Sequence, residues 1–142
     1  MKKMIVLSVV FAGMMLVGAV PTAHARVCSN AILEGAYGFS VGSIVLPAGT
    51  PRAILGRLVF DGKGSFTNTL TFNDNGTILH LTDVGTYVVD ADCTGKIFTN
   101  SSTKTIEIVV VDGGNEFYQI RTDPSSLVFL FNVAKKQFPG DN

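Results

Sequence analysis

Residues 66–76 read Phe66-Thr67-Asn68-Thr69-Leu70-Thr71-Phe72-Asn73-Asp74-Asn75-Gly76, and this stretch decides the fold class. Phe66, Leu70 and Phe72 fall on one side of an extended chain and the threonines fall on the other, because side chains alternate across a strand. The segment 73–76 supplies residues that tolerate positive φ, as tight hairpin turns require. The stretch therefore predicts a half-buried strand that ends in a hairpin.

The same pattern continues on both sides of this stretch. Short runs rich in β-branched and aromatic residues alternate with Gly, Asn and Asp clusters. We expect nine strands, at Ala36–Val45, Arg52–Asp61, Ser65–Asn73, Thr77–Thr82, Gly85–Asp90, Lys96–Asn100, Lys104–Asp112, Glu116–Thr122 and Ser126–Ala134. Such hairpin spacing predicts an all-β fold, an antiparallel meander closed into a small barrel of about eight strands, with a β-sandwich as the alternative.

Little else in the chain predicts regular structure. Ser29–Glu34 can form one helical turn with Ser29 as its cap. The polar segment Lys135–Asn142 is expected to fray.

The N-terminal segment, residues 1–25, predicts a secretory signal peptide. Two lysines begin it, an uncharged run covers Met4–Val20, and Ala23-His24-Ala25 places small residues at positions −3 and −1 of a cleavage site. The run is at the lower limit for spanning a bilayer, so we expect cleavage after Ala25. The mature chain is then a single domain, residues 26–142, without a membrane span, in the periplasm or outside the cell.

Cys28 and Cys93 are the two cysteines of the chain. An even count in an exported protein indicates a disulfide, and one pair allows one intramolecular connectivity. Neither a C-x-x-C motif nor a neighbouring histidine supports a reactive thiol. We therefore expect a structural bridge from the mature N-terminus to the turn around Cys93.

Composition and motifs exclude several function classes. Eleven basic and eleven acidic side chains cancel, so nothing would neutralise a run of phosphates, and no nucleic-acid partner is expected. His80 is the one histidine of the mature chain, no G-x-S-x-G elbow accompanies it, and zinc needs three or four ligands. Aspartates in the expected turns could bind calcium, but such side chains more often accept hydrogen bonds from their own backbone. We expect no catalytic residue, metal or cofactor.

Aromatic residues are abundant in the expected strands, and a small barrel can enclose one ligand. Gln119 and Arg121 share a face with Phe117 and could orient a guest. The alternative is that the rings simply fill the core. The candidate ligand-binding residues are Tyr37, Phe39, Tyr87, Phe117, Gln119, Arg121 and Phe129.

The strand around Phe129 is apolar on both faces, since residues 127–131 form a continuous apolar run. In a single barrel its outer face needs a cover. A packed terminal segment or a partner subunit would supply one, so an oligomer through this strand is one expectation, and a sandwich core would explain the run equally well.

Three pieces of the chain carry a family resemblance: Gly35-Ala36-Tyr37-Gly38-Phe39, Phe60-Asp61-Gly62-Lys63-Gly64 and the segment Gly85–Gly95. They resemble a group of small exported bacterial proteins of unassigned function, which are in turn similar to calycin-type barrels, the set that includes lipocalins and allene oxide cyclase-like barrels. The resemblance implies the barrel fold. The chain lacks tryptophan, and therefore the lipocalin G-x-W signature, and no cyclase catalytic residue aligns with it.

Three functions follow as expectations. The first is a binder of a small apolar molecule, which predicts a closed cavity of several hundred Å³. The second is a cyclase or isomerase whose apolar pocket folds a substrate while polar groups steer it. The third is an envelope or surface protein acting through protein contacts.

Overall fold

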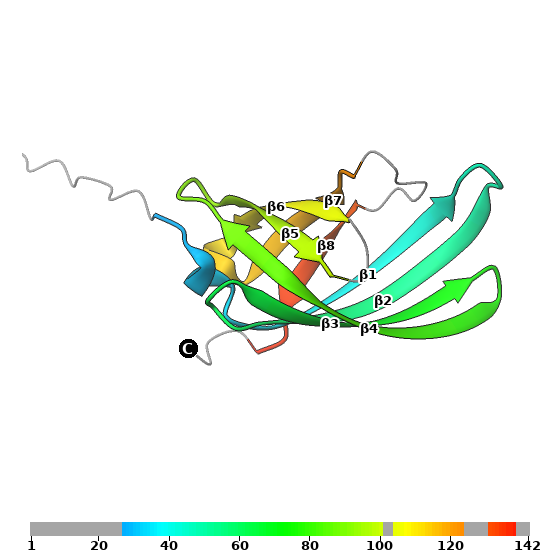
Figure 1. Ribbon diagram of the computed structural model, residues 1–142, viewed down its shortest axis with the longest axis horizontal. Coiled ribbons are helices and arrows are strands. Elements are labelled where there is room, and N and C mark those ends of the chain that lie inside the picture. The colour runs from blue at the N-terminus through cyan, green and yellow to red at the C-terminus, as the bar shows by residue number, and fades with distance from the viewer. Residues whose placement is uncertain (1–26, 101–103, 124–130, 139–142) are drawn as a thin grey trace, which may run out of the picture.

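Eight antiparallel strands form a closed barrel in which each strand pairs with its neighbours in sequence and β8 returns to β1 (Figure 1). This computed structural model describes residues 27–100, 104–123 and 131–138. The all-β meander barrel expected from the hairpin spacing is confirmed, and the sandwich alternative is wrong. The strands are β1 (Gly35–Val45), β2 (Thr50–Phe60), β3 (Ser65–Asp74), β4 (Thr77–Val89), β5 (Thr94–Thr99), β6 (Thr105–Val111), β7 (Glu116–Arg121) and β8 (Phe131–Lys136).

Strand β4 corrects the expected count of nine. Two separate strands were expected at Thr77–Thr82 and Gly85–Asp90, but β4 runs continuously from Thr77 to Val89. Asp83, which falls between the two expected strands, is only 7% exposed and lies opposite Asn68 of β3. Because the interior is polar at this level, the chain can keep an aspartate inside without leaving the sheet.

The alternation within the expected strands matches the observed faces. On β3, Phe66 and Asn68 are buried and Thr67 and Thr69 are exposed. On β1, Tyr37, Phe39 and Val41 are buried, while Ser40 and Gly42 are exposed on the outer surface. The period of two therefore assigns the lumen side of these strands correctly.

One end of the barrel is closed by the 3₁₀ turn η1 (Asn30–Leu33). Cys28 and Cys93 form the expected disulfide, with Cα atoms 5.0 Å apart. The amide oxygen of Asn30 accepts a hydrogen bond from the backbone N–H of Val89 at 2.8 Å, and Leu33 is fully buried beneath the turn. These contacts hold residues 28–33 against the closed end of the barrel, and we call this segment the plug. Ser29 precedes η1 as expected, but its hydroxyl oxygen does not accept the expected capping hydrogen bond from a backbone N–H of the turn.

A second 3₁₀ turn, η2 (Asp112–Gly114), lies against this plug. Gly114 has a φ of +93°, and a Cβ there would lie 2.2 Å from the carbonyl oxygen of Ile32. The Tyr37 hydroxyl donates to the Gly114 carbonyl oxygen. Burial raises the pKa of Tyr37 to about 12, with the nearby Tyr87 adding to the shift. Glycine is thus required where the two turns touch.

Above the plug, aromatic rings fill the closed half of the lumen. Phe60 is central, with ring centroids 4.8 to 5.8 Å from those of Tyr37, Phe66, Tyr87 and Phe117. Edge-on contacts of this kind add to the free energy of burying the rings. This half is a packed core, which leaves the other end for any guest.

The C-terminal part of the described chain also corrects an expectation. Lys135 and Lys136 were expected in a frayed tail, but they belong to β8, and Lys136 lies opposite Tyr37 of β1. They are held in place because β8 closes the barrel. The expected signal peptide, residues 1–25, and Phe129 lie outside the described residues.

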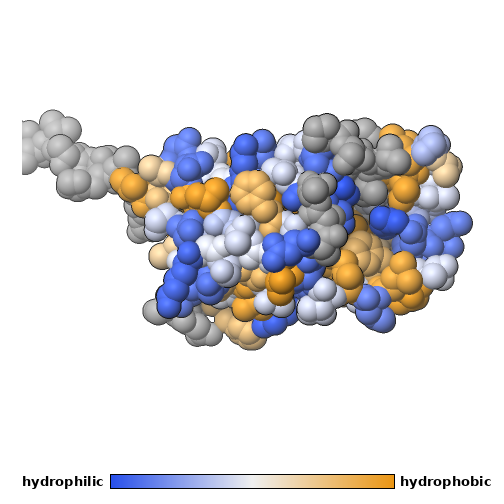
Figure 2. Space-filling view, in the orientation of Figure 1, coloured by the Kyte–Doolittle hydropathy of each residue, from blue (hydrophilic) through white to orange (hydrophobic). Residues whose placement is uncertain are grey.

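The outer surface carries exposed apolar side chains. Figure 2 shows some of them at the end formed by the tips of the β1–β2 and β3–β4 hairpins. Ile44 and Ile78 are each more than 50% exposed there. Among the described residues no helix has the length and apolar character to cross a membrane.

Candidate functional site: the open end of the barrel

The end opposite the plug contains a pocket of about 80 Å³. The β1–β2 and β3–β4 hairpins extend beyond the shorter strands β5–β8 at this end (Figure 1), so part of the inner surface stays open. The pocket is lined by Phe39, Arg52, Ile54, Leu58, Phe66, Asn68, Leu70, Phe72, Leu81, Asp83, Ile97, Thr99, Lys104, Ile106, Gln119 and Arg121. It is smaller than the several hundred Å³ expected, because the aromatic cluster occupies the closed half of the lumen.

A layer of polar side chains lies between the aromatic cluster and the pocket. Asn68 and Asp83 face each other across β3 and β4, and Gln119 and Asn132 do so across β7 and β8. All four are at most 8% exposed. The Gln119 amide nitrogen donates to the Asn132 amide oxygen at 2.6 Å. The pocket therefore has a polar floor, although its walls are mainly aliphatic and aromatic.

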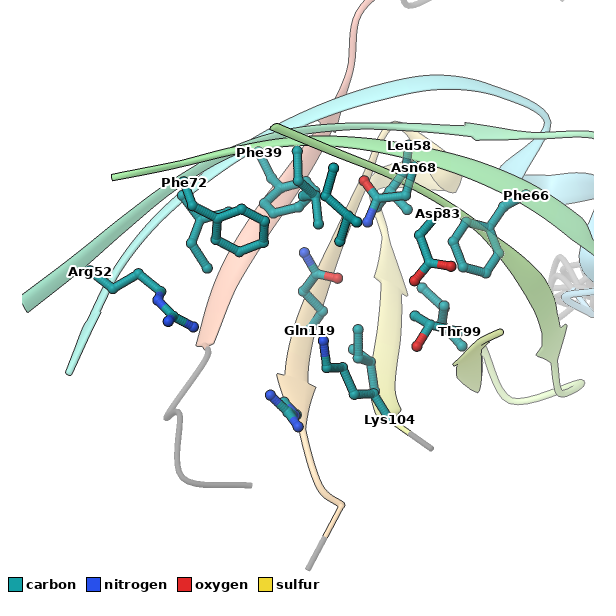
Figure 3. A pocket seen from close by; sticks show the side chains of 16 residues that line it. Phe39, Arg52, Leu58, Phe66, Asn68, Phe72, Asp83, Thr99, Lys104 and Gln119 are labelled. Carbon is teal, nitrogen blue, oxygen red and sulfur yellow. The ribbon is translucent and has the colours of Figure 1, made fainter. Parts of the chain in front are cut away.

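Cationic side chains surround the mouth of the pocket. Arg52 comes from the start of β2, Lys104 immediately precedes β6, and Arg121 ends β7. Figure 3 shows Lys104 and Gln119 pointing into the same space as Asn68 and Asp83. These residues lie far apart in sequence and meet because alternate hairpin ends open on the same side of a meander barrel.

Each arginine at the mouth has a carboxylate partner. Arg52 forms an ion pair with Asp74 of the neighbouring strand, and its guanidinium carbon lies 5.7 Å from the centroid of the Phe72 ring. Arg121 binds Asp123 through two hydrogen bonds, at 2.5 and 2.8 Å. Bidentate pairing of this kind fixes the orientation of a guanidinium group.

Lys104 has a different electrostatic environment. Its pKa is lowered because burial removes water from the ammonium group and because Arg121, and more weakly Arg52, repel its charge. Asp83 and Asp123 oppose this shift but do not cancel it. The positive charge of Lys104 is thus less stable in this pocket than in water.

Buried polar atoms in and around the pocket lack protein partners. Arg52 Nε and Asn68 Oδ1 in the lining, and Asn132 Nδ2 in the floor, make no hydrogen bond within the described structure. A buried donor or acceptor without a partner costs about 1–3 kcal/mol. Such atoms are the groups to which a guest molecule would bind most favourably.

The structure places the candidate ligand-binding residues in two groups. Phe39, Gln119 and Arg121 line the pocket. Tyr37, Tyr87 and Phe117 lie in the aromatic cluster at the closed end, where the Tyr87 hydroxyl donates to the Asn30 carbonyl oxygen at 3.0 Å. As noted, Phe129 lies outside the described residues.

Sequence reasoning did not select five polar residues of this pocket: Arg52, Asn68, Asp83, Thr99 and Lys104. A signal for Asn68 was present, because it interrupts the apolar side of the Phe66–Phe72 stretch. A polar residue on a lumen-facing side of a strand is a reason to expect a polar interior at that level. For Arg52 and Lys104, at strand ends, the sequence offers no comparable signal.

His80 and Asp61 lie away from the pocket. His80 is exposed on the outer face of β4, with Nδ1 at 3.1 Å from Thr71 Oγ1. Asp61 accepts hydrogen bonds from the backbone N–H groups of residues 63, 64 and 65 through one carboxylate oxygen, which lowers its pKa. The described part of the chain contains no group of three metal-ligating side chains.

These features define a small closed antiparallel β-barrel with a filled end and a pocketed end. Comparison of the chain with family models, with curated proteins and with solved structures found no match. The function therefore has to be inferred from the shape and chemistry of the pocket.

Proposed function

We propose that this protein is an exported calycin-like barrel that binds a small, largely apolar molecule with a polar end. Aliphatic and aromatic walls with a few convergent polar groups are the usual composition of a small-molecule site. The observation that carries the proposal is Asn68, which is 8% exposed, faces the pocket and leaves its amide oxygen without a hydrogen bond within the described structure.

The volume of the pocket limits the guest. About 80 Å³ holds only a few non-hydrogen atoms. A larger molecule would place its remainder along the inner faces of the two long hairpins, where Leu79 and Leu81 are 50% and 37% exposed. The proposal is therefore a ligand whose polar end lies among the polar side chains of the pocket and whose apolar part contacts the aliphatic and aromatic walls and the inner faces of these hairpins.

Export is part of the same proposal. The N-terminal pattern of residues 1–25 supports it, and the Cys28–Cys93 disulfide fits an oxidising compartment. Intact mass of protein purified from its own host would test both, with expected loss of residues 1–25 and a gain of two protons on reduction.

The binding test uses a matched pair of variants on one strand. Ile54 faces the pocket and Leu55, its neighbour on β2, is 65% exposed on the outer face. We expect native mass spectrometry of host-purified protein to show a non-covalent adduct. The adduct should be retained in Leu55→Trp and lost in Ile54→Trp, because the indole ring at position 54 would fill the pocket. Absence of any adduct from the wild-type protein, or its survival in Ile54→Trp, would contradict the proposal.

The convergence of Asp83, Lys104, Gln119 and Arg121 also favours a second candidate, an enzyme of the cyclase or isomerase kind. An enzyme would convert the adduct into a product on incubation, and Arg121→Ala would stop that conversion. Recovery of the bound molecule unchanged supports the binder.

A further inference from the structure

We propose that the ligand carries a carboxylate, bound at the pocket mouth by Arg52, Lys104 and Arg121. This inference rests on the proposed binding function and adds the chemical class of the ligand.

The first step is the charge that the pocket presents to a guest. Three cationic side chains line it, and Asp83 is the one lining carboxylate among the described residues. Asp74 and Asp123 pair with the two arginines but are not part of the lining. The guest therefore meets three cationic groups and one carboxylate, while the two aspartates behind hold the guanidinium groups in place and, with Asp83, balance the three positive charges.

The second step concerns hydrogen-bond donors. Arg52 Nε is buried and makes no hydrogen bond within the described structure, whereas the same side chain's Nη2 is used by Asp74. A carboxylate can accept from such a donor and from an ammonium group at the same time. A neutral hydroxyl would accept from these donors without the added strength that an ionised acceptor gives to a hydrogen bond.

The third step is the environment of Lys104. An anion beside its ammonium group would offset the burial and the repulsion from Arg121 and Arg52 that lower its pKa. An amine would meet three like charges instead. Inorganic phosphate would satisfy the charges but would leave the apolar wall formed by Ile54, Leu70 and Ile106 without a partner. The combination favours an organic carboxylate with an apolar chain.

The experiment compares hexanoate, 1-hexanol, hexylamine and inorganic phosphate by titration calorimetry on the wild-type protein at neutral pH. We expect hexanoate to bind at least tenfold more tightly than 1-hexanol, since a charge-assisted hydrogen bond contributes about that factor or more. Hexylamine should bind more weakly than 1-hexanol, and phosphate more weakly than hexanoate.

The variants assign this preference to the mouth. Lys104→Met keeps the length of the side chain and should remove most of the preference for hexanoate over 1-hexanol, whereas Lys104→Arg should retain it. Lys96→Met is the control, because Lys96 is exposed on the outer face of β5 and pairs with Glu107 at 3.7 Å. Circular dichroism of each variant checks that the barrel is intact.

A pH series gives a readout that a purely structural role would not produce. Arg121, Asp83, Asp123 and Arg52 surround Lys104, whose pKa is lowered by its burial and by the nearby arginines. The hexanoate preference should fall as pH rises through the lowered pKa. Binding in that range should take up protons, which calorimetry in buffers of different ionisation enthalpy measures.

Several results would overturn the inference: equal affinity for hexanoate and 1-hexanol, tighter binding of hexylamine, phosphate as strong as hexanoate, unchanged preference in Lys104→Met, or no binding of either six-carbon probe. These outcomes are separate from a failure of the proposed function. If Ile54→Trp abolishes 1-hexanol binding or the host adduct while hexanoate is not preferred, the binding function stands and the carboxylate does not.

Discussion

Replacement of Cys28 and Cys93 by alanine should lower the free energy of unfolding by about 4 kcal/mol, because the bridge closes a loop with a sequence separation of 65 residues. In the chain-entropy description, the bridge restricts the unfolded ensemble and its removal restores that freedom. The bridge also holds the segment before η1, whose Cys28 N–H donates to the Ala91 carbonyl oxygen at 3.2 Å. Stabilities of natural domains are about 5–15 kcal/mol, so this loss would be a large fraction of the total.

The assay is urea unfolding of the oxidised wild-type chain and the Cys28→Ala/Cys93→Ala variant, followed by far-ultraviolet circular dichroism. The single variant Cys93→Ala should lose nearly as much as the double variant, since one cysteine cannot form the bridge. Native-state hydrogen exchange should show the greatest loss of protection at the plug, near Leu33. A loss below about 1 kcal/mol in the double variant would refute the loop-closure reasoning.

Further tests probe the closed end and the strand faces. Tyr37→Phe should lower the free energy of unfolding by about 1–3 kcal/mol, because the Gly114 carbonyl loses its donor in a buried site. Wild-type stability should fall as pH rises from about 10 to about 12, because the raised pKa of Tyr37 means that the folded state keeps a proton which the unfolded state releases. Urea titrations of Tyr37→Phe should show a smaller fall, since Tyr87, whose pKa burial also raises, remains. Gly85→Ala should prevent folding or lower stability by more than about 3 kcal/mol, because its Cβ would lie 2.0 Å from the Phe98 carbonyl oxygen, whereas Gly42→Ala, with open space around it, should be neutral or stabilising in the same thermal melts.

The candidate site was accessible to sequence reasoning only where side-chain alternation applied. Gln119 and Arg121 were selected because they share a face with Phe117, and β7 places all three inward. Tyr37 and Tyr87 were selected as aromatic residues of the expected strands, but periodicity does not tell how deep in the lumen a residue lies. Depth depends on the register of every strand pair and on which end is plugged. The aromatic cluster and the pocket are therefore indistinguishable in the sequence.

The amino-acid sequence by itself determined the all-β class, the turns, the inward faces of the strands and the single cysteine pairing, because each depends on local periodicity, on backbone preferences at Gly, Asn and Asp, or on a count. Only the tertiary structure decided that β4 is continuous, that one half of the lumen is filled, and that Arg52, Lys104 and Arg121 meet at one mouth. Those features arise from barrel closure, which brings together residues far apart in sequence and sets the burial of each.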